Sequence, residues 1–200
     1  NIIENLGINY LHPKNLKEEI SKPNKVKKIL LTIDDGFQSF YDNAWPVLKT
    51  KNIPFILFIS TTYVGKKGYM NWEQIKEIEE SGLGIIGNHS HTHEYLVDKT
   101  NNQIINDINQ AIELFEKKLG YSPKYFSYPF GEYSNDFKKI LKNLNLNIAF
   151  GQHSGVIDSS KNYLELPRFP INEKYGNLDR FKFILNLFPF PYKEIYPENR

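Results

Sequence analysis

The stretch KILLTIDDG, residues 28–36, joins a short run of aliphatic and β-branched residues to two aspartates and a glycine. A short apolar run that ends in a turn signal is typical of a buried strand. We therefore expect a strand over residues 28–32 and a turn that contains Asp34 and Asp35. The two carboxylates would then lie at the carboxyl end of the strand.

Strands and helices alternate along the rest of the chain. Short apolar runs predict further strands over residues 54–59, 84–87, 125–128 and 147–150. Apolar periodicity and stop signals predict helices over residues 40–51, 72–81, 102–119, 136–144 and 177–188. The region 164–171 is less regular. This alternation favours an α/β fold with a parallel sheet, either open or rolled into a barrel.

The composition narrows the range of functions. A chain of 200 residues that is 40% hydrophobic can bury the core of one compact domain without disulfides. The net charge of +2 gives no indication of a nucleic acid or an anionic membrane as partner. Cysteine is absent, which excludes thiol nucleophiles and cysteine zinc sites. Any metal must therefore be held by histidine and carboxylate side chains.

The chain also lacks the signals of membrane insertion. No apolar run approaches the ~20 residues that a transmembrane helix needs. The first residues, NIIE, have neither the basic region nor the apolar segment of a secretion signal. Because there is no initiator Met, we expect a processed or trimmed piece.

Three histidines in HSHTH, residues 89–93, follow the strand expected at 84–87. On one turn of chain, His89 and His93 would face the same side and could bind one ion at roughly 2.0–2.1 Å each. If the segment were extended, His91 would join them in a three-histidine site without Asp35. We favour the turn, because the segment follows a glycine at a strand end.

In a parallel sheet, residues just beyond the carboxyl ends of the strands share one rim. We therefore expect side chains from distant parts of the sequence to converge there: Asp34, Asp35, His89, His93, Tyr128, Phe130 and His153. Two adjacent aspartates can divide the work, one binding a cation and the other accepting a proton from water. An ordinary tight turn at Asp35-Gly36 is the alternative.

Three segments, LTIDDGF (31–37), HSHTH (89–93) and SYPFG (127–131), resemble in order and spacing three motifs of the polysaccharide deacetylases, carbohydrate esterase family four, also called the NodB homology domain. The similarity extends from about residue 28 to residue 171 and includes NWEQI (71–75). The resemblance implies a deformed (β/α) barrel and removal of N-acetyl groups from an N-acetylglucosamine-containing polysaccharide.

The resemblance also implies a role for each site residue. Asp34 would be the general base, while Asp35, His89 and His93 would hold a divalent metal, with Zn²⁺ favoured over Co²⁺ or Ni²⁺. A backbone N–H near Phe130 would help to hold the oxyanion. Tyr128, Pro129, Phe130 and Arg168 are the candidate substrate-binding residues.

Two positions depart from the family pattern. Many relatives have an Arg that orients the base where this chain has Ser127. Arg168 could supply that cation, although a surface salt bridge is the commoner fate of a lone Arg. The late motif with the general-acid His is missing, so His153, the only downstream histidine, is the candidate acid, with an ordinary loop histidine bonded to backbone as the alternative. In relatives with a permuted order, the general acid precedes the two aspartates. His12 is the only histidine before them in this chain, and its neighbours Leu11 and Pro13 give little support for this role. A residue outside the chain is the remaining option.

The departures leave rival functions open. An O-acetyl esterase acting on a xylan-like polymer could use the same metal site, and an ester needs less help from an acid. A non-catalytic carbohydrate-binding domain would bind glycan without releasing acetate. By resemblance we expect a polysaccharide substrate, a periplasmic, cell-surface or secreted location, an N-terminal segment over residues 1–27 and a catalytic domain over residues 28–200.

Overall fold

The computed structural model describes residues 2–22, 27–172, 174 and 176–186. Its centre is a parallel sheet of five strands, which follow one another in space in the same order as in the chain. The strands are β3 (Leu31–Ile33), β4 (Phe55–Ile59), β5 (Gly84–Asn88), β6 (Tyr125–Ser127) and β7 (Ile148–Phe150). The predicted α/β fold with a parallel sheet is confirmed.

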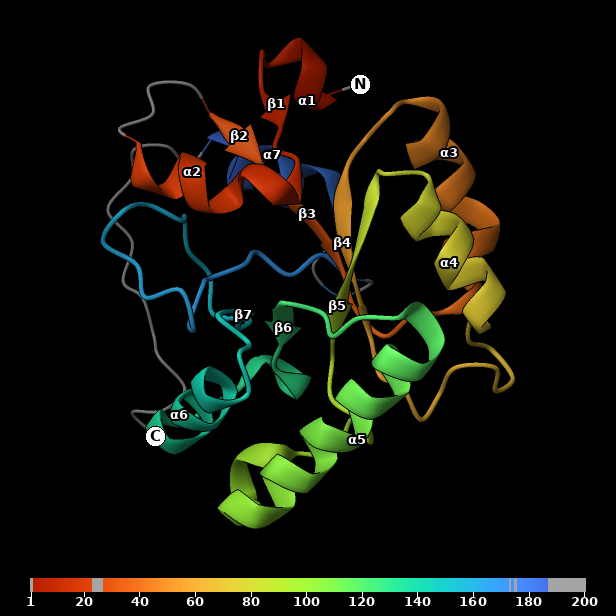
Figure 1. The fold of residues 1–200 in the computed structure, drawn as a ribbon. Coiled ribbons are helices and arrows are strands. Elements are labelled where there is room, and N and C mark those ends of the chain that lie inside the picture. Colours follow the sequence, from red (N-terminus) through yellow and green to blue (C-terminus); the bar gives the residue numbers. More distant parts are fainter. Residues whose placement is uncertain (1, 23–26, 173, 175, 187–200) are drawn as a thin grey trace.

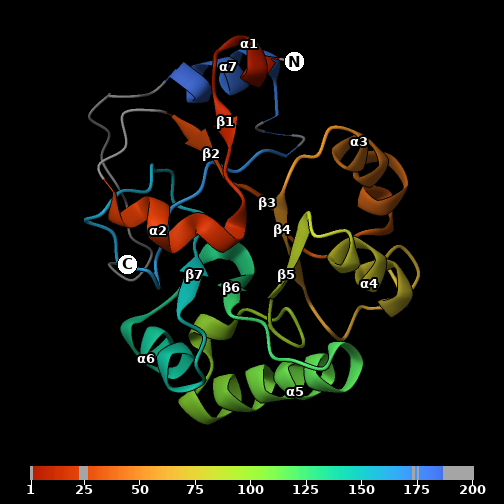
Figure 2. The ribbon, with the colours of Figure 1, turned by 45° about the horizontal axis from the view of Figure 1, so that its top comes forward.

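A helix follows each strand of this sheet. The helices are α3 (Trp45–Thr50), α4 (Trp72–Glu80), α5 (Asn101–Leu119), α6 (Asn135–Asn143) and α7 (Leu178–Asn186). Figures 1 and 2 show α3, α4, α5 and α6 around the outside of the sheet, which curls into a half-barrel. The expected deformed barrel is therefore confirmed. The helix expected over 177–188 corresponds to α7, and residues 187 and 188 lie outside the described residues.

Capping residues set the starts of helices α4 and α5. At the start of α4, Asn71 forms a complete capping box with Gln74, and at the start of α5, Thr100 does the same with Gln103. Each box satisfies two backbone N–H groups that a helix end would leave unpaired. Helix α5 ends at Gly120, whose φ of 83° is left-handed and costs a glycine nothing.

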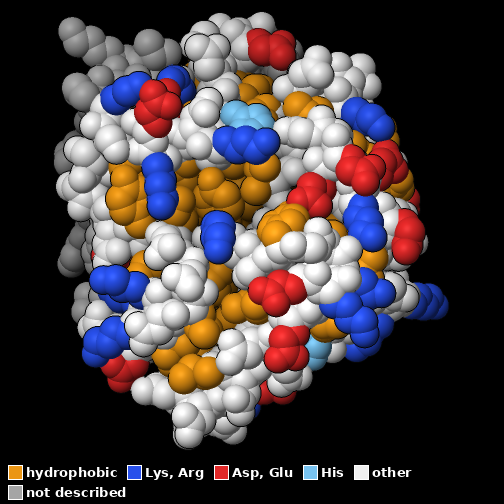
Figure 3. Space-filling model, viewed as in Figure 1, with side chains coloured by type: hydrophobic (Ala, Val, Ile, Leu, Met, Phe, Trp, Pro, Cys, Tyr) orange, Lys and Arg blue, Asp and Glu red, His pale blue; other side chains and the backbone are white. Residues whose placement is uncertain are grey.

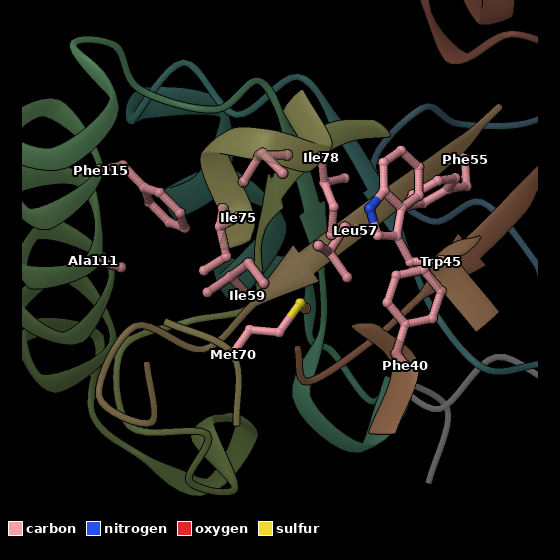
Figure 4. Close-up of a cluster of buried hydrophobic side chains, with 11 residues drawn as sticks. Phe40, Trp45, Phe55, Leu57, Ile59, Met70, Ile75, Ile78, Ala111 and Phe115 are labelled. Carbon is pink, nitrogen blue, oxygen red and sulfur yellow. The ribbon is translucent and has the colours of Figure 1, made fainter. Parts of the chain in front are cut away.

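Strand β4, the second strand of the sheet, divides its side chains between two cores. All of β4 is buried, as expected for a strand covered on both faces. Phe55 and two further residues of β4 pack towards the helices, and Figure 4 shows Phe40 and Trp45 beside Phe55 at one end of this cluster, with Phe115 of α5 at the other. Ring centroids of Phe40 and Trp45 lie 5.4 and 5.9 Å from that of Phe55.

The strand predicted over residues 28–32 is divided between two sheets. Its first part, β2 (Lys28–Ile29), pairs in parallel with β1 (Asn9–Tyr10), and only β3 enters the central sheet. The sequence could not indicate this division, because β1 is two residues long and has no apolar run. The short helices α1 (Ile2–Asn5) and α2 (Leu16–Ser21) were likewise not predicted.

The segment before β2 covers the other side of β4. Leu11, Leu16 and Ile20 pack in one cluster with Ile56 and Phe58, the β4 residues that point away from the helices. Nε2 of His12 lies 3.0 Å from the carbonyl oxygen of Gly82, just before β5 begins. The N-terminal segment therefore contacts the amino end of the sheet, and the carboxyl ends of the strands are left for a site.

The opening between β7 and β3 is crossed by the region over residues 164–171. Leu166 forms an isolated parallel bridge with Phe150 of β7. The bridge is supported by hydrogen bonds from the Leu166 N–H to the Ala149 oxygen at 2.9 Å and from the Gly151 N–H to the Leu166 oxygen at 3.0 Å. This irregular segment therefore extends the sheet towards its first strand.

The face of the molecule seen in Figure 3 is not dominated by charge of one sign. On the face seen in Figure 3, Lys and Arg side chains alternate with Asp and Glu side chains, and apolar side chains appear between them. None of the helices in the described residues combines the length and the apolar character that a membrane span requires.

Candidate metal centre

Three potential metal ligands converge at the carboxyl ends of β3 and β5. Oδ1 of Asp35 lies 3.5 Å from Nε2 of His89 and 3.3 Å from Nε2 of His93. The potential ligand atoms of these residues all lie within 4.8 Å of one another, and they form the one such cluster within the described residues. The structure thus brings together the three residues that the sequence analysis assigned to a metal.

The histidine segment has the turn-like geometry that we favoured. It follows β5 as an irregular turn, and the Ser90 Oγ accepts a hydrogen bond from the His93 N–H at 3.0 Å. His91 points elsewhere, because its Nδ1 lies 2.8 Å from the Thr61 Oγ1. The extended arrangement with three histidines on one face is therefore not adopted.

The donor set fits a divalent metal. Nδ1 of His89 lies 2.7 Å from the Ser127 carbonyl oxygen, which can only accept, so Nδ1 has the proton and Nε2 has the free lone pair. Burial lowers the pKa of His93 and favours the neutral imidazole that a metal requires. Ligands at tetrahedral angles around zinc would be about 3.3–3.4 Å apart, in agreement with the two distances to Asp35.

Asp34 lies beside this cluster and is held by Arg168. Nη1 of Arg168 donates to Oδ1 at 2.8 Å and Nη2 donates to Oδ2 at 2.9 Å, while the Ser127 Oγ donates to Oδ2 at 3.1 Å. Oδ2 of Asp34 is also 3.9 Å from Nε2 of His89. Burial would raise the pKa of Asp34, but the charge of Arg168, helped by His89 and the hydrogen bonds, lowers it to about 2.

Arg168 occupies the space next to Ser127, the position where many relatives have an Arg. Its Nη2 donates to the Ser127 Oγ at 2.9 Å and its Nε donates to the Gly151 oxygen at 2.8 Å. Only 12% of the Arg168 side chain is exposed, so this is no surface salt bridge. These contacts support an orienting role towards Asp34 more than direct contact with a substrate.

The backbone of the site has unusual conformations. Of the described non-glycine residues, six have positive φ, and four of them are Asp35 (74°), Ser90 (68°), His93 (56°) and Phe130 (59°). The other two are asparagines, which tolerate this region well. Each such residue costs on the order of 1–3 kcal/mol and persists only where its surroundings impose it. Strain is thus concentrated at the residues that surround the proposed metal.

Asp107 fixes the histidine turn, and the sequence analysis missed it. Its carboxylate accepts hydrogen bonds from the His91 N–H at 2.8 Å, the Thr92 N–H at 3.1 Å and the Thr92 Oγ1 at 2.5 Å. The residue is 6% exposed and lies on the buried stripe of α5. An acidic residue at helical spacing from Ile104 and Ala111 was the signal that could have revealed it.

The three residues of the SYPFG segment that were assigned to substrate differ in exposure. Tyr128 is fully buried and its hydroxyl donates to the Leu164 oxygen at 2.8 Å, and Pro129 is also buried. Their side chains therefore belong to the core. Phe130 is 53% exposed, and its ring centroid lies 5.0 Å from that of His93. The exposed ring of this segment is thus next to a proposed metal ligand.

The two candidate general acids, His12 and His153, lie in different parts of the fold. His12 lies at the amino end of the sheet, where its ring contacts Gly82, and β5 separates it from His89. The structure therefore does not bring His12 to the metal-binding cluster. His153 follows β7, is 9% exposed and packs against Tyr133 with ring centroids 6.0 Å apart. Among the described residues it does not join the metal-binding cluster.

Comparison with known proteins identifies the family. The family model described as Polysaccharide deacetylase matches residues 21–149. The match covers more than half of the chain, so the chain belongs to the polysaccharide deacetylase family. The resemblance of the three sequence motifs is thereby confirmed.

Individual relatives share about a quarter of their residues with this chain. A protein of Staphylococcus aureus named poly-beta-1,6-N-acetyl-D-glucosamine N-deacetylase is 26% identical over 160 residues, which cover 74% of this chain and 55% of that protein. The chain thus spans about half the length of this relative. Among solved structures, IcaB from Ammonifex degensii is similar with a TM-score of 0.80 and 25% identity, covering 86% of this chain and 80% of that one.

A second solved structure, the Streptococcus pyogenes deacetylase PplD in complex with acetate, has a TM-score of 0.81. It is 21% identical, and the match covers 92% of this chain and 82% of that one. At this identity the similarity supports the fold.

Asp34 should make the metal-free protein sensitive to acid. Its pKa is about 2 in the folded state and about 3.9 in an unfolded chain, so the folded state binds this proton less readily. The ionised carboxylate therefore contributes stability that is fully present above about pH 4 and is lost as the pH falls through about 2. Urea unfolding at stepped pH should show a contribution of about 2 kcal/mol.

The matched variant for this measurement is Asp34→Asn, whose unfolding free energy should change less between about pH 4 and pH 2. Identical pH profiles for the two proteins would show that the Arg168 pair does not stabilise the ionised carboxylate.

Asp107→Asn should weaken zinc binding about 10–100-fold. The amide has one acceptor oxygen in place of two, and its NH₂ group would face N–H donors of the histidine turn. Competition with a chromophoric chelator measures the affinity. Glu113→Gln makes the same chemical change on the exposed side of α5 and should leave the affinity as it is. Equal affinities of the Asp107→Asn variant and the unchanged protein would contradict the role of Asp107.

Proposed function

We propose that the chain is a metal-dependent hydrolase that removes N-acetyl groups from an N-acetylglucosamine-containing polysaccharide. The candidate substrates are peptidoglycan, a surface glycan and a chitin-like polymer. The supporting observation is the position of Asp34, an ionised carboxylate 3.9 Å from the His89 imidazole, beside three donors that fit one divalent metal. The name of the Staphylococcus aureus relative supports the N-acetyl substrate.

In this proposal Asp34 is the general base. When bound, a divalent metal such as Zn²⁺ polarises the acetyl carbonyl and makes a water molecule at the site more acidic. Asp34 accepts a proton from that water, and the oxygen of the water attacks the carbonyl carbon of the acetyl group. With a pKa of about 2, Asp34 is ionised throughout the neutral range, and it depends on the metal to make the water acidic enough to give up its proton. Arg168 and Ser127 hold both carboxylate oxygens and so fix the direction in which the proton is taken.

The oxyanion that forms needs a hydrogen-bond donor. In the SYPFG segment, the Tyr128 N–H donates to the Phe150 oxygen and the Gly131 N–H donates to the Tyr128 oxygen. Pro129 has no N–H. We assign the N–H of Phe130, where the φ of 59° changes the direction of the backbone, as the donor to the oxyanion.

The leaving amine must also gain a proton. His153 is our candidate for this acid, but at 9% exposure it would become accessible to a polymer only after its surroundings move. This observation favours one second candidate function, an O-acetyl esterase, because an alkoxide can leave without prior protonation, whereas an amine leaves only after its nitrogen has gained a proton. The two functions differ in the acetyl bond that is broken, and not in the roles of Asp34 or the metal ligands.

The proposed substrate indicates where the enzyme acts. A polymer of this kind places the enzyme in the periplasm, at the cell surface or outside the cell.

We propose that residues 28–200 form the catalytic domain. Residues 1–27 are then an N-terminal segment whose apolar side chains complete the domain's core against β4.

The purified chain should release acetate from N-acetylglucosamine oligomers when zinc is present, and removing the zinc with a chelator should abolish the release. Asp34→Asn should lower kcat by about 10²–10⁴-fold, because the water loses its proton acceptor. Asp136→Asn is the matched control, since Asp136 is exposed on α6 and pairs with Lys139, and it should retain full activity.

The outcomes separate the candidate functions. Zinc-dependent release from an acetyl ester but not from the N-acetyl oligomers would replace the deacetylase by the esterase. Glycan binding with release from neither substrate would replace both by a binding domain. Full activity of Asp34→Asn would reject Asp34 as the base.

A further inference from the structure

A stack of three aromatic rings lies next to the metal centre. Tyr69 is in the middle, with ring centroids 4.8 Å from that of Tyr63 and 5.1 Å from that of Phe37. Lys66 covers the outer side of Tyr63, with its Nζ 5.0 Å from the ring centroid. Phe37 ends the stack at the other side and is 43% exposed. Of the three rings, that of Phe37 is exposed, whereas Tyr63 and Tyr69 are half-buried.

The stack is held against the turn that contains Asp35. Phe37 and Tyr69 form an antiparallel bridge. The Gln38 N–H donates to the Gly68 oxygen at 2.8 Å, and the Met70 N–H donates to the Gly36 oxygen at 3.0 Å. These bonds join the loop between β4 and α4 to the residues that directly follow Asp35. The position of the Phe37 ring is thus fixed relative to the metal ligand two residues before it.

A second exposed ring lies at the other flank of the centre. Phe130 is 53% exposed, and its ring centroid is 5.0 Å from that of His93 and 5.7 Å from that of Tyr95. Phe130 follows β6, whereas Phe37 follows β3, and the strand of the two histidines, β5, lies between them in the sheet. Since Asp35 and His93 are 3.3 Å apart, the two rings flank the same point.

We propose that Phe37, supported by Tyr69 and Tyr63, is a sugar-binding platform, and that the glycan crosses the metal centre with one sugar ring on Phe37 and another near Phe130. The C–H groups on a pyranose face are apolar and weakly positive, so they match the negative face of an aromatic ring. The acetyl group that reacts then belongs to a sugar with neighbours on both sides. The chain acts on internal units of a polymer and prefers long oligomers to short ones.

This inference rests on the proposed function, because it names the part of the substrate that the site holds. Single exposed apolar residues are common on protein surfaces, and Phe183 on α7 is 63% exposed. Phe37 differs from Phe183 in two respects: it ends an ordered stack of rings, and its backbone is bonded into the turn of the metal centre.

Calorimetric titration of the metal-free protein with β-1,6-linked N-acetylglucosamine hexamer and dimer tests the platform without turnover. Phe37→Ala should weaken hexamer binding about tenfold and change dimer binding less. Phe37→Trp should restore hexamer binding because it keeps a ring face. Phe183→Ala is the matched control and should bind the hexamer as the unchanged protein does.

Phe37→Leu covers the case in which the alanine variant fails to fold, since leucine keeps the apolar volume and removes the ring. Undiminished hexamer binding by a folded Phe37→Ala or Phe37→Leu variant would overturn the platform, as would an unchanged protein that binds neither oligomer.

The platform and the proposed function fail in different ways. Acetate release by the zinc-loaded protein, together with unaltered hexamer affinity in the Phe37 variants, overturns the platform and leaves the hydrolase intact. Hexamer binding that depends on Phe37, without acetate release, supports the platform and overturns the hydrolase.

Discussion

The ion pair between Arg168 and Asp34 connects the two ends of the curled sheet. Asp34 follows β3, the first strand, and Arg168 belongs to the segment that bridges to β7, the last strand. The pair therefore crosses the opening of the half-barrel at the rim where the potential metal ligands lie. A bidentate guanidinium pair fixes orientation as well as charge, so closure of the barrel and ionisation of Asp34 depend on the same contact. Without the contact to Arg168, the pKa of Asp34 would be higher and the orientation of its carboxylate would be less well defined.

The remaining parts of the centre depend on buried elements in the same way. Asp107 ties the histidine turn to α5, whose apolar side packs in the core. The Ser127 oxygen sets the tautomer of His89. These contacts come from α5 and β6, and they hold the turn in which Ser90 and His93 have left-handed conformations. The stability of the fold is thus used to hold the three ligand side chains close together, which lowers the cost of organising the site for a metal.

Periodicity was enough to predict the strands and helices around the sheet, because burial of β4 and of one side of α5 leaves a direct pattern in the sequence. Convergence of Asp35, His89 and His93 followed from parallel topology. Other features depend on contacts that no local pattern records: β2 leaves the central sheet because Asn9 and Tyr10 offer a second partner. A lone Arg168 could equally have been a surface residue, and only the tertiary structure shows its contact with Asp34.

The central claim is that Asp35, His89 and His93 together form one metal site. The most direct test is X-ray absorption spectroscopy at the zinc edge on the protein loaded with one equivalent of zinc. The claim predicts two imidazole nitrogens and one carboxylate oxygen at about 2.0–2.2 Å, with half of the imidazole signal lost in His89→Ala. A zinc environment without imidazole scattering, or one that His89→Ala leaves unchanged, would contradict it.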